Sequence, residues 1–230
     1  MKRTGGTSEA KRRAGEAAAD RVTDEEVVGL GTGSTAAHAI RALGRAVDSG
    51  LDIRGVPTSF QSRELAREVG IPLTTLDEAT PDVAIDGADE VAGFDLVKGG
   101  GAAHAREKYV ANAADRFLVV ADDSKLTDAL AGPVPVEFLP DARAPVAAAI
   151  RDAGGEPTLR AAERKDGPVV TDNGNLVFDC AFDEIDPEPL AATLSAIPGV
   201  VEHGLFVGMA DAVFVGRVDG VERRVPPLSE

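Results

Sequence analysis

Several residue types are scarce in this 230-residue chain, and each scarcity excludes a class of protein. A single cysteine, Cys180, excludes an internal disulfide framework. It lies in the alternating apolar run NLVFDCAF and is expected to pack as a small core residue. No apolar run approaches the roughly 18 residues that a membrane span needs, and the N-terminus lacks the apolar centre of a secretory signal. These absences predict a cytoplasmic protein with no membrane partner.

Positive charge is scarce as well. The formal net charge is −15, and only six of the 24 basic residues are lysines. Nucleic-acid binding needs a basic face, so we expect no nucleic-acid partner. High acid content, few lysines and 4% aromatic residues together suggest an organism with a salty cytoplasm, that is, an acidic, halophile-like protein.

The first 130 residues alternate between apolar strands and helices. We predict strands at EEVVGL, DIRGVPTS, IPLTTL, PDVAID and RFLVVAD, and a first helix over 8–21. This alternation predicts βαβ units and a mostly parallel sheet. Ligands of such sheets bind beyond the carboxyl ends of the strands. The polar loops GTGST, DGADE, KGGG and ADDSK all follow strands, so we expect them to meet at one edge.

The order of elements changes near residue 131. The remaining segments predict strand, helix, strand, a hairpin around DNGN, helix and strand, which is close to a ferredoxin-like βαββαβ unit. We therefore expect a second, smaller α+β domain over 131–205. The segment ADAVFVGRVDG then predicts two strands that return to the first domain, which comprises 1–130 plus 206–230.

GLGTGSTA, residues 29–36, follows a strand and opens a helix. Its small residues let backbone N–H groups converge at a helix N-terminus, where an anion is favoured, and Ser34 and Thr35 add hydroxyl donors. A phosphate site is the first interpretation, and a tight turn with a Ser/Thr cap is the second. The string also fits the dinucleotide fingerprint, but the acid that this fingerprint needs at the end of the next strand is missing, because Asp52 lies at its start. A P-loop is excluded because no Gly-Lys-Ser/Thr occurs.

DGADE places Asp86, Asp89 and Glu90 directly after an apolar strand, and Gly87 and Ala88 leave room for a ligand. Carboxylates clustered at a strand end suggest general acid/base chemistry. Two alternatives stay open: a solvated acidic turn, and a Mg²⁺ or Ca²⁺ site. The EF-hand spacing is absent, and no His-rich set of ligands is visible.

KGGGAAHAREK places three glycines between Lys98 and a helix expected to start near Ala102. The glycines of 99–101 can aim successive N–H groups at one point, which makes a nest for an oxyanion, and Lys98 adds a full positive charge. Glu107 would lie on the second turn of the helix. Alone it is an ordinary solvated helix residue, but beside an oxyanion nest it is a candidate proton-transfer base.

The remaining candidates are weaker. Lys125 in ADDSK either reaches a phosphate or pairs with the neighbouring aspartates. The histidines, His38, His104 and His203, lack metal-ligand spacing, and ordinary packing is the better interpretation.

The candidate residues thus form a phosphate cradle, paired carboxylates, an oxyanion nest and a glutamate. Such a set suits abstraction of a proton α to a carbonyl in a phosphorylated small molecule. It requires no metal and no redox cofactor.

GTGSTA, DGADE, KGGGAAHAREK, ADDSK, VTDNGN and IPGVVEHGLF, in this order, closely resemble the type A ribose-5-phosphate isomerases. The resemblance runs from about Lys11 to about Gly216. It implies an α/β fold, with a Rossmann-like, mostly parallel catalytic domain and a ferredoxin-like α+β domain, assembled as a homodimer or homotetramer. It also implies an aldose–ketose isomerase that interconverts D-ribose 5-phosphate and D-ribulose 5-phosphate in the non-oxidative pentose phosphate pathway.

The resemblance also implies roles for individual residues. Glu107 would move the proton between C1 and C2, Asp86 would assist ring opening with Asp89 beside it, and Lys98 would stabilise the enediolate. The further substrate-binding residues implied are Lys11, Thr32, Gly33, Ser34, Thr35, Gly87, Ala88, Gly99, Gly100, Gly101 and Lys125.

Two other functions are weighed against this one. A sugar-phosphate-binding regulatory module would carry a basic DNA-binding segment, and none is visible. A related isomerase or deaminase that acts on another sugar phosphate, such as glucosamine 6-phosphate, would be separated by a substrate assay.

Overall fold

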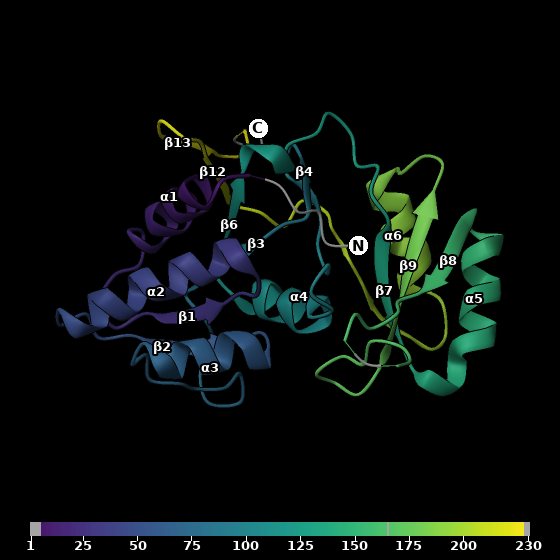
Figure 1. Ribbon diagram of the computed structural model, residues 1–230, viewed down its shortest axis with the longest axis horizontal. Coiled ribbons are helices and arrows are strands. Elements are labelled where there is room, and N and C mark those ends of the chain that lie inside the picture. The colour runs from purple at the N-terminus through teal and green to yellow at the C-terminus, as the bar shows by residue number, and fades with distance from the viewer. Residues whose placement is uncertain (1–5, 165, 228–230) are drawn as a thin grey trace. The chain divides into compact units, whose positions relative to one another are not determined.

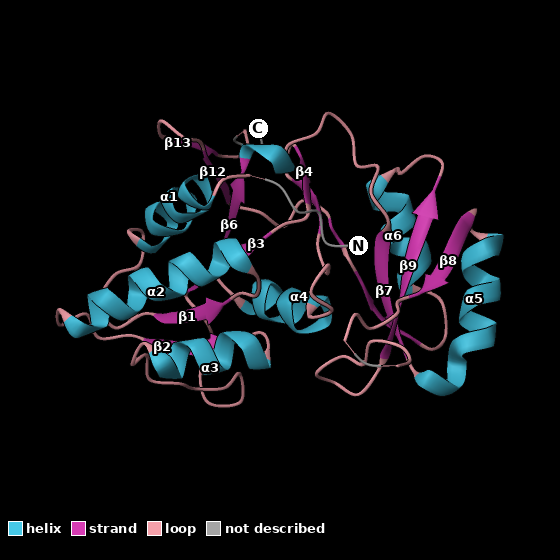
Figure 2. Ribbon diagram, viewed as in Figure 1, coloured by secondary structure: helices cyan, strands magenta, loops and turns pink. Residues whose placement is uncertain are grey.

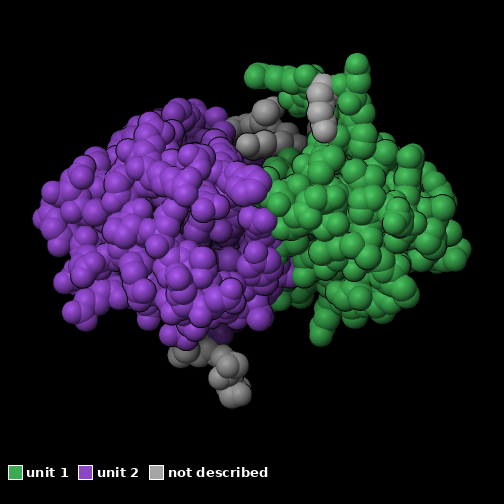
Figure 3. Space-filling model, turned by 90° about the horizontal axis from the view of Figure 1, so that it is seen from below, with its two compact units in different colours: residues 1–3, 89–105, 127–207 green, residues 4–88, 106–126, 208–230 purple. Residues whose placement is uncertain are grey.

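The structure is a computed structural model that describes residues 6–164 and 166–227 (Figure 1). The described residues pack into two compact units, which Figure 3 distinguishes by colour. Of the described residues, unit 1 comprises 89–105, 127–164 and 166–207, and unit 2 comprises 6–88, 106–126 and 208–227. The division into domains at residues 131 and 205 stays a prediction.

A six-stranded sheet forms the centre of unit 2, in the order β13-β12-β6-β3-β1-β2. Its strands are β1 (Val27–Leu30), β2 (Arg54–Pro57), β3 (Val83–Gly87), β6 (Arg116–Asp122), β12 (Ala212–Gly216) and β13 (Val221–Arg224). Every neighbouring pair is parallel except β12 with β13, which confirms the expected mostly parallel sheet. The strand order reverses at β1, so β1 and β3 flank the position where ligands of such sheets bind.

The helices of unit 2 lie against this sheet (Figure 2). They are α1 (Ser8–Ala19), α2 (Ser34–Asp48), α3 (Phe60–Glu68) and α4 (His104–Ala113), whose first two residues group with unit 1. Ala14, Ile40 and Leu65 from the first three helices share one core with Val28 and Phe214 of the strands. Helix α4 packs closely on β1, because a Cβ atom on Gly29 would lie 2.7 Å from Val110 Cγ1.

Unit 1 contains a four-stranded antiparallel sheet in the order β10-β7-β9-β8. The elements run β7 (Val134–Phe138), α5 (Arg143–Asp152), β8 (Gly155–Leu159), β9 (Leu176–Phe182), α6 (Pro187–Ser195) and β10 (Val200–His203). This confirms the ferredoxin-like βαββαβ prediction. Cys180 is fully buried, and burial raises the pKa of its thiol to about 12, which confirms its place in the core.

Unit 1 also holds a sheet that the sequence did not predict. Strands β4 (Glu90–Ala92), β5 (Asp95–Val97) and β11 (Leu205–Phe206) pair in the order β11-β5-β4. Strand β11 lies more than a hundred residues after β5, so no local pattern marks their pairing. This sheet holds the start of the KGGG segment.

Three local predictions are wrong, and one hairpin is shorter than predicted. IPLTTL is not a strand: it makes a single bridge, from Leu73 to Gly55, and Pro72 has no N–H with which to extend a ladder. The DNGN segment forms a minimal hairpin, with one antiparallel bridge between Val170 and Leu176 and a hydrogen bond from the Thr171 amide to the Asn175 carbonyl at 2.9 Å. Strand β13 begins at Val221, beyond the expected segment. Helix α4 begins at His104 rather than near Ala102.

Across the described residues, no helix combines the length and the apolar character that crossing a membrane requires.

Candidate active site

The polar loops of unit 2 meet at the carboxyl edge of its parallel sheet. The loop after β1 is bonded to the ends of both neighbouring strands. The Thr32 amide donates to Asp86 Oδ1 at 2.9 Å, and Thr32 Oγ1 lies 2.9 Å from Thr58 Oγ1 and 2.6 Å from Ser59 Oγ. These bonds fix the loop at the point where the strand order reverses.

The N-terminus of α2 is open toward this edge. Gly33 is its N-cap residue, has a φ of 107°, which favours glycine, and provides no side-chain cap. Ser34 is exposed and Thr35 is buried in the first turn. First-turn N–H groups, the helix dipole and two hydroxyls therefore favour negative charge at this end of the helix.

Asp86 ends β3 as a buried carboxylate that two backbone amides orient. Its Oδ1 accepts from Thr32 at 2.9 Å and from Gly87 at 2.7 Å, and the residue is 3% exposed. A Cβ atom on Gly31 would lie 2.3 Å from the carboxyl carbon of Asp86. Glycine at this position thus lets the β1 loop approach the aspartate.

Two lysines lie along the same edge. Lys125, only 6% exposed, belongs to a 3₁₀ turn (Asp123–Lys125) that directly follows β6 and is capped by Asp122. Lys11 lies near the start of α1. A Cβ atom on Gly216, the last residue of β12, would lie 1.9 Å from the carbonyl oxygen of Ala10, so the start of α1 abuts the carboxyl end of β12.

In unit 1, Lys98 follows β5 and is 2% exposed. Its backbone N–H donates to the Gly204 carbonyl at 2.8 Å, and its Nζ lies 5.3 Å from the centroid of the Phe206 ring, a cation–π contact. The Gly100 amide donates to Asp89 Oδ2 at 2.7 Å, and a Cβ atom on Gly100 would lie 2.8 Å from that carboxylate. Asp89 thereby orients the glycine loop.

Arg160, at the end of β8, also contacts the glycine loop, and the sequence did not single it out. Its Nη1 donates to the Gly99 carbonyl at 2.8 Å. Its Nε and Nη2 donate hydrogen bonds to the two carboxylate oxygens of Asp179 on β9. Burial raises the pKa of Asp179, but hydrogen bonds from Arg160 and its charge outweigh burial and lower it below its usual range. Eighteen arginines occur in the chain, and no spacing signal distinguishes this one.

Glu107 lies in the first turn of α4 and is 5% exposed. The prediction that it lies on the second turn is wrong, because Ala102 has a φ of 59° and the helix begins two residues later. A carboxylate in the first turn lies near the unpaired N–H groups of the helix end, which favour negative charge.

The structure therefore divides the predicted residues between its two units. Unit 2 gathers Thr32, Gly33, Ser34, Thr35, Asp86, Gly87 and Lys125 at the edge of its sheet and also holds Lys11, Ala88 and Glu107. Unit 1 holds Asp89, Lys98, Gly99, Gly100 and Gly101. Within the described ranges, no group of three or more His, Cys, Asp or Glu side chains could hold a metal ion.

The histidines occupy the predicted elements. His38 lies in α2, His104 begins α4 and His203 ends β10. His104 is fully buried with Nε2 at 3.3 Å from the Glu202 carbonyl, and His203 Nδ1 accepts from the Leu205 amide at 3.2 Å. These two histidines pack as structural residues.

Comparison with known proteins gives a consistent result. The family model of ribose 5-phosphate isomerase A (phosphoriboisomerase A) matches residues 54–220. The ribose-5-phosphate isomerase A of Natronomonas pharaonis is 70% identical over 225 residues, which cover 97% of this chain and all of that protein.

Solved structures agree. The ribose 5-phosphate isomerase A of Methanocaldococcus jannaschii is 43% identical, with a TM-score of 0.93 over 96% of this chain and 100% of that one. A D-ribose-5-phosphate isomerase solved in complex with phospho-erythronic acid is 42% identical, with a TM-score of 0.93 over the same shares.

Proposed function

The chain belongs to the ribose-5-phosphate isomerase A family, and we propose that it works through an enediolate with Glu107 as the base. Family membership makes it an enzyme, a ribose-5-phosphate isomerase. The reaction interconverts D-ribose 5-phosphate and D-ribulose 5-phosphate, and we place it in the non-oxidative pentose phosphate pathway.

The proton transfer follows from the chemistry of the α-hydroxy aldehyde. Glu107 removes the proton from C2, the electron pair forms a C1–C2 double bond, and the carbonyl oxygen becomes the enediolate oxygen. The proton returns to C1 while the O2 hydroxyl gives its proton to O1, which leaves the ketone at C2. The Glu107 carboxylate is buried in the first turn of α4, so little water can hydrogen-bond to it. This favours its use as a base.

The other residues bind the substrate and the developing charge. The open N-terminus of α2, with Thr32, Gly33, Ser34 and Thr35, holds the phosphate, assisted by Lys125 and Lys11. Asp86 assists ring opening with Asp89, which also orients Gly100. Lys98 stabilises the enediolate as a buried positive charge. A relative solved with phospho-erythronic acid, a phosphorylated sugar acid, supports an anion-binding site of this kind.

The observation that carries this proposal is the family match over residues 54–220, which includes Glu107. A coupled assay with ribose 5-phosphate and with glucosamine 6-phosphate, each with and without EDTA, tests it. We expect turnover of ribose 5-phosphate alone and no loss with EDTA. Turnover of only the amino sugar, or full loss with EDTA, would contradict the proposal.

Ser34→Ala should raise the KM for ribose 5-phosphate about tenfold and leave kcat within a few-fold, because it removes one hydroxyl donor to the phosphate. Steady-state kinetics measures both constants. Ser49→Ala at the other end of α2, where the hydroxyl donates only to the Arg45 carbonyl at 2.9 Å, is the matched control and should change neither. A fall in kcat alone would place Ser34 in the chemical step instead.

Assembly as a homodimer or homotetramer, a cytoplasmic location and the absence of a nucleic-acid partner stay predictions.

A further inference from the structure

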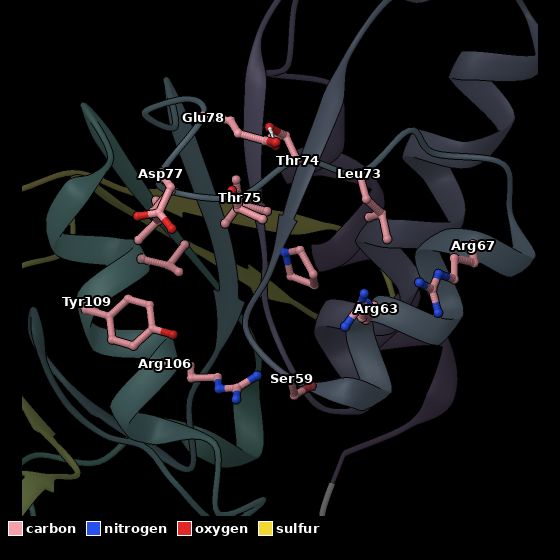
Figure 4. A pocket seen from close by; sticks show the side chains of 14 residues that line it. Ser59, Arg63, Arg67, Leu73, Thr74, Thr75, Asp77, Glu78, Arg106 and Tyr109 are labelled. Carbon is pink, nitrogen blue, oxygen red and sulfur yellow. Dashed lines mark hydrogen bonds between the residues drawn. The ribbon is translucent and has the colours of Figure 1, made fainter. Parts of the chain in front are cut away.

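Unit 2 contains a pocket of about 610 Å³ that the proposed reaction does not use. It is lined by parts of β2, α3, α4 and the segment 73–78 (Figure 4). None of its 14 lining residues belongs to the predicted substrate site. Its volume lies in the range of sites for small molecules.

One side of the pocket is positive. Figure 4 shows Arg63 of α3 and Arg106 of α4 on either side of Ser59 in the lining of the pocket. The guanidinium of Arg106 lies 5.4 Å from the centroid of the Phe60 ring, which holds it in place. Among the residues that the structure describes, the Arg63 side chain has no ion pair or hydrogen bond, although acids outnumber bases 39 to 24. Two guanidinium groups in the lining of one pocket suit the binding of a phosphate.

The opposite side offers acceptors. Thr75, Asp77 and Glu78 line it, and Glu78 already accepts from Thr74 Oγ1 at 3.1 Å (Figure 4). A ligand with phosphate at one end therefore needs hydrogen-bond donors, such as hydroxyl groups, at the other. Between the two sides, apolar side chains and the ring of Tyr109, which is 51% exposed, form a surface for a short carbon chain.

We propose that this pocket binds a small phosphomonoester with a hydroxylated carbon chain. The phosphate lies between Arg63 and Arg106, and the hydroxyl groups donate to Asp77. The concave shape and the separation of charge along it favour such a ligand over a second copy of the chain. The proposal does not depend on the role of Glu107.

The chain supplies a reporter for this pocket. Tyr109 is its only tyrosine and it has no tryptophan, so tyrosine fluorescence reports on this site. Titration of the full chain with glycerol 3-phosphate should give a saturable change with one site per chain. Arg63→Gln should weaken binding at least about tenfold. Arg45→Gln on α2 is the control, because Arg45 pairs with Glu16 at 2.7 Å and does not line the pocket, and should bind as the wild type does.

Three outcomes would overturn the proposal. The first is the absence of a saturable change. The second is a signal that Ser34→Ala abolishes and Arg63→Gln does not, because the reporter would then respond to the substrate site. The third is an altered sedimentation coefficient of Arg63→Gln with unchanged binding, because the surface would then contact a second copy.

A different observation, in unit 1, points to a positioning residue for the proposed reaction. The Gly99 carbonyl accepts from the Ala102 amide at 2.9 Å and from Arg160 Nη1 at 2.8 Å. Gly99 and Ala102 have φ values of 102° and 59°, so the loop holds a conformation that non-glycine residues rarely adopt. Asp179 fixes the guanidinium that stabilises this loop.

We infer that Arg160 positions the loop that presents Lys98, and this inference rests on the proposed function. Arg160→Lys keeps the positive charge. A lysine cannot make the bidentate hydrogen bonds to the Asp179 carboxylate and also donate to the Gly99 carbonyl. We expect kcat for ribose 5-phosphate to fall about 10- to 100-fold with little change in KM. Arg151→Lys on α5, where the side chain is 54% exposed, is the control and should be unaffected.

The outcome separates three cases. If the wild-type protein does not turn over ribose 5-phosphate, the proposed function is refuted. If the wild type is active and Arg160→Lys has the same kcat, the positioning role is refuted, even if the melting temperature of the variant is lower. A lower kcat at unchanged melting temperature supports it.

Discussion

Glu107→Gln is expected to lower kcat for ribose 5-phosphate by about 10²–10⁴-fold, the range that general acid–base catalysis contributes. The amide keeps the size of the side chain and can still donate and accept hydrogen bonds, but it cannot take a proton from C2. Because the phosphate groups are held by other residues, KM should stay within a few-fold of the wild-type value. Steady-state kinetics with purified variant and wild type measures both constants.

A second readout separates loss of the base from loss of structure. In D₂O, the wild type should exchange the C2 proton of the substrate with solvent during turnover, and Glu107→Gln should lose exchange and turnover in parallel. Glu64→Gln, a side chain 68% exposed on α3, is the control for removing one carboxylate from so acidic a chain. Near-normal turnover in Glu107→Gln would assign the base to another residue.

Much of the fold could be predicted from the sequence because its signals are local. Fully apolar runs such as VVGL and RFLVVAD become central parallel strands, and the βαββαβ order of unit 1 follows from the turns between its elements. The loops that follow β1, β3 and β6 could be placed at one sheet edge because parallel strands bring their carboxyl ends together. The same reasoning fails for KGGG, which follows β5 of the separate three-stranded sheet in unit 1. DGADE and KGGG were recognisable because each combines glycine with a charged side chain, whereas GTGST combines glycine with hydroxyl side chains.

The rest depends on non-local contacts. Strand β5 pairs with β11 far along the chain, and Arg160 reaches Gly99 across 61 residues of sequence. The start of α4 depends on the φ of Ala102, and alanine gives no sequence signal for a left-handed conformation. Such features arise from packing, which composition and periodicity do not encode.

The structure also changes the interpretation of the glycines. Glycine was predicted for its N–H groups and its backbone freedom. At Gly31 and Gly100 the absent side chain matters at least as much, because a Cβ atom would lie 2.3 Å and 2.8 Å from the carboxylates of Asp86 and Asp89. Each predicted acid thus packs against the backbone of a glycine loop.

The VTDNGN motif has a structural role that its hairpin pattern did not suggest. Glu137 on β7 is fully buried, and its Oε1 accepts from Thr171 Oγ1 at 2.9 Å, Asn173 Nδ2 at 3.0 Å and Asn175 Nδ2 at 2.8 Å. The carboxylate therefore holds the whole turn against the sheet. These side-chain donors add to the single bridge, between Val170 and Leu176, that closes the hairpin.

Glu137→Ala should lower the free energy of unfolding of unit 1 by about 3 kcal/mol, because it removes a charged acceptor from three donors and leaves a cavity. Each unit carries one reporter: Cys180 is buried in unit 1, and Tyr109 is the only tyrosine, in unit 2. Thiol labelling of Cys180 against urea should therefore show a lower midpoint. Glu156→Ala on β8 of the same sheet, where the side chain is 71% exposed, should change the free energy by less than about 0.5 kcal/mol.

Comparison of the two reporters also tests how the chain is divided. If the units unfold independently, Glu137→Ala shifts the midpoint from Cys180 labelling and leaves that from Tyr109 fluorescence in place. If they unfold together, both midpoints shift by the same amount, because a single transition loses the same stabilisation. A Cys180 midpoint equal to that of Glu156→Ala would contradict the role of Glu137, since three buried hydrogen bonds to one carboxylate cannot be lost without cost.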